Sequence, residues 1–115
     1  MKCFICVADG MYLGIPADKT ERIMPSADAG QGAILLADLL AFNDKSPVHA
    51  LLIKNPVNKT LLTPKIESEI EIPEESVRRL PASLSPMEKY FIGASFLNEN
   101  VLLIFNTDQL TEDFA

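Results

Sequence analysis

Residues 2–16 read KCFICVADGMYLGIP, in which Asp9-Gly10 separates two apolar segments. An Asp-Gly pair between apolar runs is a strong signal for a β-hairpin, because the tight turn needs positive φ angles that these residues tolerate. The sequence therefore predicts strands over residues 2–8 and 11–15.

Cys3 and Cys6 lie in the first of these strands with the C-x-x-C spacing of some redox and metal sites. Residues three apart in a strand point to opposite faces, so the two thiols cannot bind one metal ion or pair as a disulfide while the strand persists. A zinc site of this type also needs a second ligand pair, and the chain has only two cysteines. We therefore expect two buried, unreactive thiols.

Further short apolar segments follow, separated by polar turns and by eight prolines. They predict strands over 20–24, 48–54, 59–63, 65–72, 90–97 and 101–105, while residues 33–36 fit either strand or helix. Asp38 is placed to cap a short helix over residues 39–42. About eight or nine short strands with little helix indicate an all-β barrel or sandwich. The length indicates a single domain over residues 1–115.

Residues 65–72, KIESEIEI, alternate between two kinds of side chain. This period predicts a half-buried strand. One face is expected to carry Ile66, Ser68, Ile70 and Ile72, and the other Glu67, Glu69 and Glu71. The carboxylates could attract a hard cation such as Ca²⁺, but an open strand face lacks the enclosing loop of such sites. A solvated acidic face is therefore favoured over a metal site.

Other residues with chemical potential lack the partners that a catalytic site needs. His49 is the only histidine, and no motif links it to a nucleophile. Gly30-Gln31-Gly32 lacks the length and the lysine of a phosphate-binding loop. Arg78-Arg79 could contact an acidic partner, although a solvated pair is favoured. We expect a binding protein that is not an enzyme and needs no cofactor.

The composition narrows the classes of partner. Ten basic residues stand against sixteen acidic ones, for a net charge of −6. This balance disfavours nucleic acid and anionic membranes as partners. The chain has no apolar run near the ~20 residues of a membrane-spanning helix, and its start lacks the features of a signal peptide. We expect a cytoplasmic protein without membrane insertion.

Several motifs recur in an order that is known from one protein family. They are Tyr12-Leu13-Gly14-Ile15, Thr20-Glu21-Arg22-Ile23, Ala37-Asp38-Leu39, Tyr90-Phe91-Ile92-Gly93 and Asp108-Gln109-Leu110. In this order and spacing the chain resembles the CheW-like domain, the adaptor domain of bacterial chemotaxis. The likeness covers nearly the whole chain, and it rests on the combination because no single motif is specific.

The resemblance implies a fold and a role. The fold is two small SH3-like five-stranded barrels packed together. The role is that of a scaffold, without catalysis, between chemoreceptors and the regulatory domain of the CheA histidine kinase. The chain is shorter than the family pattern around residues 25–33 and lacks its Arg-Gly stretch, so the first barrel could be incomplete. A strand edge left open by this loss could pair with a second copy, so the sequence allows a homodimer.

The resemblance also places Arg22, Ile23 and Met24 near one partner-binding surface. Arg22 stands where the family motif has Glu, which reverses the charge. In the competing interpretation Ile23 and Met24 are core residues and Arg22 is merely solvated. Two other functions stay open. One is a structural or assembly protein of the same fold outside chemotaxis, with a different protein partner. The other is a small enzyme or metal-dependent binder that uses Glu67, Glu69 and Glu71.

Overall fold

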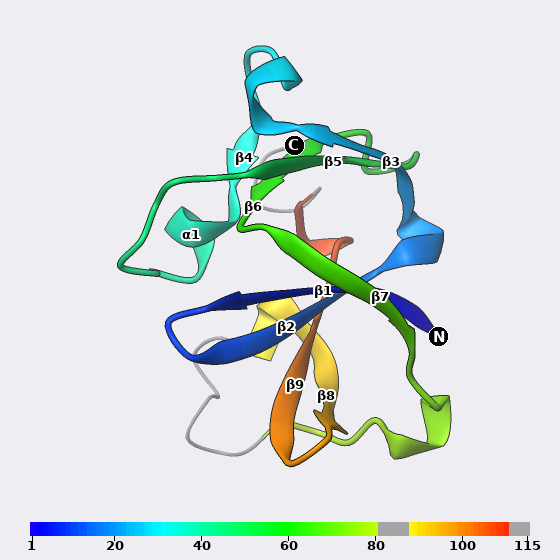
Figure 1. The fold of residues 1–115 in the computed structure, drawn as a ribbon. Helices are drawn as coiled ribbons and strands as arrows, with labels where there is room; N and C mark the ends of the chain where they lie inside the picture. The colour runs from blue at the N-terminus through cyan, green and yellow to red at the C-terminus, as the bar shows by residue number, and fades with distance from the viewer. Residues whose placement is uncertain (81–87, 111–115) are drawn as a thin grey trace.

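The computed structural model describes residues 1–80 and 88–110, and its strands form two sheets, seen one above the other in Figure 1. The lower sheet has five strands in the order β7-β1-β2-β9-β8. Their bounds are β1 Lys2–Ala8, β2 Met11–Pro16, β7 Ile66–Glu71, β8 Phe91–Leu97 and β9 Asn100–Phe105.

The upper sheet has four strands in the order β3-β5-β6-β4. Their bounds are β3 Thr20–Pro25, β4 Ile34–Leu35, β5 His49–Ile53 and β6 Thr60–Thr63. The helical elements are α1 Leu36–Leu39 and the 3-10 turns η1 Ala17–Lys19, η2 Ser26–Asp28 and η3 Glu74–Ser76. The predicted all-β class is confirmed. In the described residues the strand pairing leaves β7 and β8 at the edges of one sheet, and β3 and β4 at the edges of the other.

The first hairpin forms as its sequence predicts. Asp9 and Gly10 both have positive φ, at 51° and 75°, which lets two residues reverse the chain between Ala8 and Met11. The pairing of β1 with β2 is antiparallel from Cys3↔Pro16 to Ala8↔Met11. The turn chemistry therefore sets the register of this hairpin.

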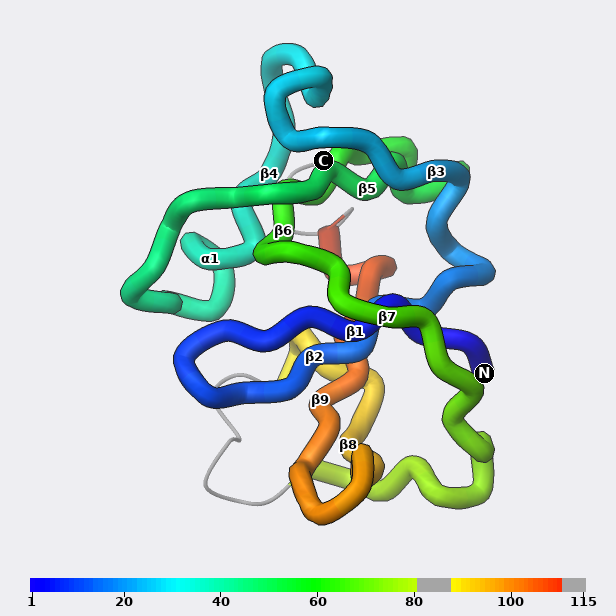
Figure 2. The backbone as a smooth tube through the Cα atoms, in the orientation of Figure 1, coloured from blue at the N-terminus to red at the C-terminus, as the bar shows by residue number. Residues whose placement is uncertain are grey.

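Two parallel pairings join strands that are distant in the sequence. Strand β2 pairs with β9 over Tyr12↔Leu102 to Gly14↔Ile104, and β4 pairs with β6 over Ile34↔Leu61 and Leu35↔Leu62. The first pairing brings the two terminal hairpins into one sheet. Between β6 and β7 the chain passes directly from the upper sheet to the lower one, as the tube in Figure 2 shows.

The main hydrophobic core lies between the two sheets. It contains residues from the upper face of the five-stranded sheet, the inner face of the four-stranded sheet and α1, including Leu13, Phe105, Leu51, Leu61 and Leu36. A second, smaller cluster covers the other face of the five-stranded sheet and contains Cys3, Ile5, Ile72, Leu102 and Ile104. The central strands β1, β2 and β9 are therefore buried on both faces over much of their length, which explains why they are nearly continuous apolar runs.

The predicted cap at Asp38 is wrong. Helix α1 begins at Leu36, its N-cap is Leu35, and no side chain caps it by a hydrogen bond. Leu36 and Ala37 are buried in this helix. Burial of these apolar residues therefore sets where the helix begins, and Asp38 lies inside it with its carboxylate 3.1 Å from the Lys45 ammonium.

The prediction that Ile66 shares one face of β7 with Ile70 and Ile72 is also wrong. The pairing runs Ile5↔Ser68 and then Cys6↔Ile66, so Glu67 is an extra residue in a β-bulge. The bulge turns Ile66 toward the main core, whereas Ile70 and Ile72 pack with the smaller cluster. One inserted residue thus lets β7 contribute to both cores.

Candidate functional site

The three residues expected at a partner surface lie on β3, at an edge of the four-stranded sheet. Arg22 is exposed, Ile23 is 36% exposed and Met24 is half-buried. None of them belongs to the buried core. The structure therefore leaves all three accessible at least in part.

These residues do not share one face of the sheet. Ile23 pairs with Leu51, a buried residue of the main core, so its side chain lies on the inner face at the rim of the core. Arg22 pairs with Leu52, and Met24 pairs with Ala50. Because side chains alternate along a strand, Arg22 and Met24 lie on the outer face.

The outer face continues from β3 across β5 to β6. Opposite Ala50 stands Leu62, and opposite Leu52 stands Thr60. Leu52 and Leu62 are half-buried and belong to neither hydrophobic cluster, and Leu62 lies beside the loop that precedes β5. We call Arg22, Met24, Leu52 and Leu62 the outer-sheet surface. It combines an apolar floor with one cation at its edge.

Sequence reasoning missed Leu52 and Leu62. The apolar stretches HALLI (49–53) and TLLT (60–63) carry no alternation that marks one face as outer, so the sequence offered no signal for these two residues. Strand periodicity by itself does not say which of its two faces meets the core. The pairing decided it, since Leu51 and Leu61 face the core and their neighbours face outward.

Arg22 has no ion-pair partner in the described part of the chain. The ion pairs found there join the amino group of Met1 to Glu71 and Lys45 to Asp38. The guanidinium is thus free to meet an acidic group on another molecule, which is the recognition that its planar set of donors suits.

The three glutamates of β7 lie spread along an exposed strand. Glu67, Glu69 and Glu71 are exposed as expected. Glu71 accepts a hydrogen bond from the amino group of Met1, and this contact lowers the pKa of its carboxyl. Among residues 1–80 and 88–110, no three His, Cys, Asp or Glu side chains gather closely enough to hold a metal ion.

The two cysteines lie in different cores. Cys3 belongs to the smaller cluster and Cys6 to the main core, and neither side chain is exposed to solvent. Burial raises the pKa of Cys3 to about 11 and that of Cys6 to about 12. The expectation of two buried free thiols on opposite faces is confirmed. A thiol must ionise to attack or to bind a metal, so burial and the raised pKa values both favour slow reaction of these two thiols.

His49 and Arg78 have structural contacts. The imidazole Nδ1 of His49 accepts a hydrogen bond from the Ile66 backbone N–H at 2.9 Å. Arg78 exchanges two backbone hydrogen bonds with Ala94, and its side chain donates to the carbonyls of Glu75 and Val77. These contacts give both side chains a structural role in the described part of the chain.

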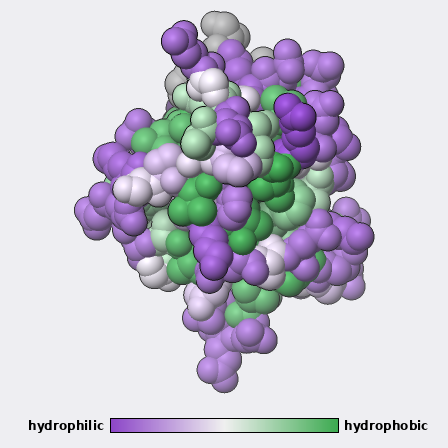
Figure 3. Space-filling view, turned by 45° about the horizontal axis from the view of Figure 1, so that its top comes forward, coloured by the Kyte–Doolittle hydropathy of each residue, from purple (hydrophilic) through white to green (hydrophobic). Residues whose placement is uncertain are grey.

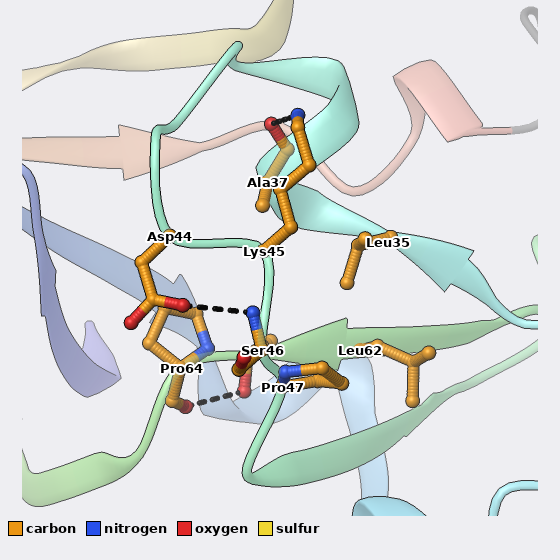
Figure 4. Close-up of a pocket in the computed structure, with 9 residues that line it drawn as sticks. Leu35, Ala37, Asp44, Lys45, Ser46, Pro47, Leu62 and Pro64 are labelled. Atoms are coloured by element: carbon orange, nitrogen blue, oxygen red, sulfur yellow. Dashed lines mark hydrogen bonds between the residues drawn. The ribbon is translucent and has the colours of Figure 1, made fainter.

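A small cleft lies where the loop before β5 meets β4 and β6 (Figure 4). Its empty volume is about 160 Å³, below the several hundred cubic ångströms of most small-molecule sites. Its polar groups already bind one another: Lys45 Nζ donates to the Ala37 carbonyl, and the Ser46 N–H donates to Asp44. The cleft therefore offers little to a ligand.

The molecular surface mixes apolar and polar regions. On the face drawn in Figure 3, patches of hydrophobic residues lie near the middle, with hydrophilic residues between and around them. In the described residues, no helix has the length and apolar character that crossing a membrane requires.

Comparison with known proteins identifies a similar fold. No family model and no curated protein sequence matches the chain. Among solved structures, it is similar to the crystal structure of the scaffolding protein TtCheW from Thermoanaerobacter tengcongensis. The TM-score is 0.71, the identity is 11%, and the match covers 91% of this chain and 83% of that one. The chain therefore has a CheW-like fold.

Proposed function

We propose that this protein is a non-catalytic adaptor in bacterial chemotaxis or a related signal-transduction system. In this role it binds the regulatory domain of a histidine kinase, a chemoreceptor, or both. The observation that carries the proposal is the CheW-like fold over 91% of the chain, which TtCheW, a scaffolding protein, shares. The motif order described above supports the same role independently of the structure.

The binding surface in this proposal is the outer-sheet surface together with Ile23. Its apolar residues supply contact area, and Arg22 supplies a charge that selects the partner, since interface charges govern specificity more than affinity. Strand β3 is an edge strand of its sheet in the described residues, so one row of its backbone groups has no strand partner there. A second copy pairing there as a homodimer would compete with the adaptor's partner.

The proposal includes finer statements about the chain. We propose that residues 1–115 act as one domain, and that the two sheets correspond to the two SH3-like barrels of the family. The site of action is the cytoplasm, where receptor tips and kinase meet.

Calorimetric titration tests the function directly. The purified protein is titrated with the CheA regulatory domain of the organism that carries it, and a full-length CheW adaptor from that organism serves as control. Binding with micromolar or tighter affinity is the expected result. No heat of binding beside a working control would contradict the kinase partner.

The alternative is a structural or assembly protein with the same fold and a different partner. Arg22 favours it, because a cation at an exposed edge position where the family has an acid would repel a partner built to meet that acid. The identity of the neighbouring genes distinguishes the two hypotheses. Receptor and histidine-kinase genes beside this one favour the adaptor, and their absence favours the alternative.

A further inference from the structure

A row of apolar side chains crosses four strands at the turn end of the five-stranded sheet. It contains Ala8 on β1, Met11 on β2, Val101 on β9 and Phe96 on β8. Ala8 pairs with Met11, and Phe96 pairs with Val101. Met11 and Val101 each precede the paired residues Tyr12 and Leu102 of the parallel strands, which places them side by side. We call these four residues the hairpin-end row.

The row lies on the face that carries the main core but extends beyond its cover. Ala94, two residues before Phe96 on β8, and Leu103, two residues after Val101 on β9, are buried in that core. Phe96 is 69% exposed and Val101 is 48% exposed. An exposed aromatic ring directly opposite an exposed β-branched residue forms a joined apolar patch, and such patches mark interaction sites more often than scattered apolar residues do.

The two turns that border the row each carry an acid, whereas the exposed Arg78 lies beside β8 opposite Ala94. Asp9 occupies the turn between β1 and β2, and Glu99 occupies the turn between β8 and β9. Residues 90–110, which contain the second hairpin, include no Lys or Arg, and the one cation of the first hairpin is Lys2, at the end of β1 far from the turn. Both turns that border the patch are thus acidic, on a chain of net charge −6. A partner with basic groups around an apolar anchor complements this surface.

We propose that the hairpin-end row is a second docking surface, which binds a basic protein segment with an apolar anchor residue. The anchor packs on Phe96 and Val101, and flanking Lys or Arg side chains face Asp9 and Glu99. A second copy of this chain fits less well, because its own row would bring Asp9 and Glu99 against their equivalents. The surface is separate from the outer-sheet surface, which lies on the other sheet.

Fluorescence anisotropy with two labelled peptides tests the proposal. One twelve-residue peptide has Leu and Phe in the middle and Lys on both sides, and its matched control has Glu in place of every Lys. We expect the Lys peptide to bind with an affinity that falls as salt is raised, and the Glu peptide to bind at least tenfold more weakly. Equal binding of both peptides, or of neither, would overturn the proposal.

Three variants locate the binding. Phe96→Ser should weaken the Lys peptide by at least tenfold, and Glu99→Lys by about threefold, since a single exposed charge contributes modestly. Ile92→Ser is the matched control, because Ile92 is 52% exposed on the same strand and lies outside the row; it should stay within twofold of the unmodified protein. Equal loss in Ile92→Ser, or unchanged binding in Phe96→Ser, contradicts the assignment.

Analytical ultracentrifugation checks for the competing occupant. A monomer whose mass does not depend on concentration agrees with a docking surface for another protein. A dimer that Phe96→Ser dissolves would overturn the proposal, because the second copy would then cover the row. Failure of the kinase titration leaves this test unaffected, since Arg22 and the outer-sheet surface take no part in it.

Discussion

His49 Nδ1 accepts the backbone N–H of Ile66 at 2.9 Å, and this bond joins the start of β5 to the start of β7. The two residues belong to different sheets. The bond satisfies a backbone donor at the point where the chain leaves β6 and enters the lower sheet, between two strands that do not pair with each other. The single histidine thus serves as a link between sheets.

Replacing His49 with Phe should destabilise the protein by about 1 kcal/mol, because the half-buried Ile66 N–H loses its acceptor. His49→Asn is the matched variant, since its side-chain oxygen can take the place of Nδ1 and should recover part of the loss. Urea unfolding followed by circular dichroism measures both. A Phe variant as stable as the unmodified protein would show that the bond contributes nothing.

Gly93 lies against the segment that crosses the edge of β8. A Cβ at this position would come 2.6 Å from the Arg78 carbonyl oxygen and 2.8 Å from a Val77 methyl. Gly93→Ala should therefore push this segment away and cost about 1–3 kcal/mol. Gly14→Ala is a graded control, because its nearest contact would be 3.3 Å, to a Cys3 side-chain atom. Thermal unfolding that ranks Gly14→Ala as the more damaging change would refute this account.

The buried thiols predict slow chemical labelling. Because burial raises the pKa of Cys3 to about 11 and that of Cys6 to about 12, almost no thiolate is present near pH 8. A disulfide reagent should modify both thiols slowly in buffer and rapidly in concentrated urea. Fast reaction of one thiol in the folded protein would mean that its strand opens readily.

The same burial predicts a loss of stability in alkali. The pKa of Cys6 rises from 9.0 in the unfolded chain to about 12 in the fold, so the unfolded chain releases its proton first. Stability due to the neutral thiol is complete below pH 9 and declines between pH 9 and 12, by about 1.4 kcal/mol per pH unit. Urea unfolding at several pH values should give a shallower decline for Cys6→Ala than for the unmodified protein; equal slopes would argue against a buried thiol.

Arg22→Glu should shift partner choice without changing the fold. The side chain is exposed, so the free energy of unfolding should stay within about 0.5 kcal/mol. Affinity for the CheA regulatory domain should rise by about tenfold, if an acid at this position is what that domain meets. Arg79→Glu makes the same charge change at another exposed position and should have no effect. An unchanged titration curve for Arg22→Glu removes Arg22 from the interface.

The acidic face of β7 should not respond to calcium. Free calcium at 100 times the dissociation constant of a site would add about 2.7 kcal/mol to the free energy of unfolding. This would raise the melting temperature by several degrees. We expect no shift at millimolar CaCl₂, because Glu67, Glu69 and Glu71 lie on an exposed strand and Glu71 is occupied by the amino group of Met1. A shift abolished by Glu69→Gln would revive the metal-dependent alternative.

The positions of most strands along the chain could be predicted from the residues. Asp9-Gly10 sets the first hairpin, and the predicted strand over 2–8 matches β1. The face of Cys3 and that of Cys6 follow from alternation alone, since they are odd in spacing. Alternation failed at Ile66, where the bulge at Glu67 reverses the facing of the residue before it. Local periodicity carries no information about an inserted residue, which depends on the register of the neighbouring strand.

The candidate binding surface was predicted only in part. Arg22, Ile23 and Met24 were singled out by resemblance, and the structure leaves them accessible on β3. The separation of Ile23 from the other two, and the addition of Leu52 and Leu62, required the pairing of β3, β5 and β6. The hairpin-end row was not anticipated, since its four residues come from both ends of the chain.

The sequence by itself determined the all-β class, the first hairpin and the inert character of the two thiols. These follow from turn chemistry and side-chain alternation, which act within a few residues. Only the tertiary structure decided that β2 pairs with β9, which sheet face is outer at β5, and that Phe96 stands beside Val101 and near Met11. The reason is that pairing between distant strands depends on which side chains are buried in each of the two hydrophobic clusters. A pattern within a few residues does not specify this.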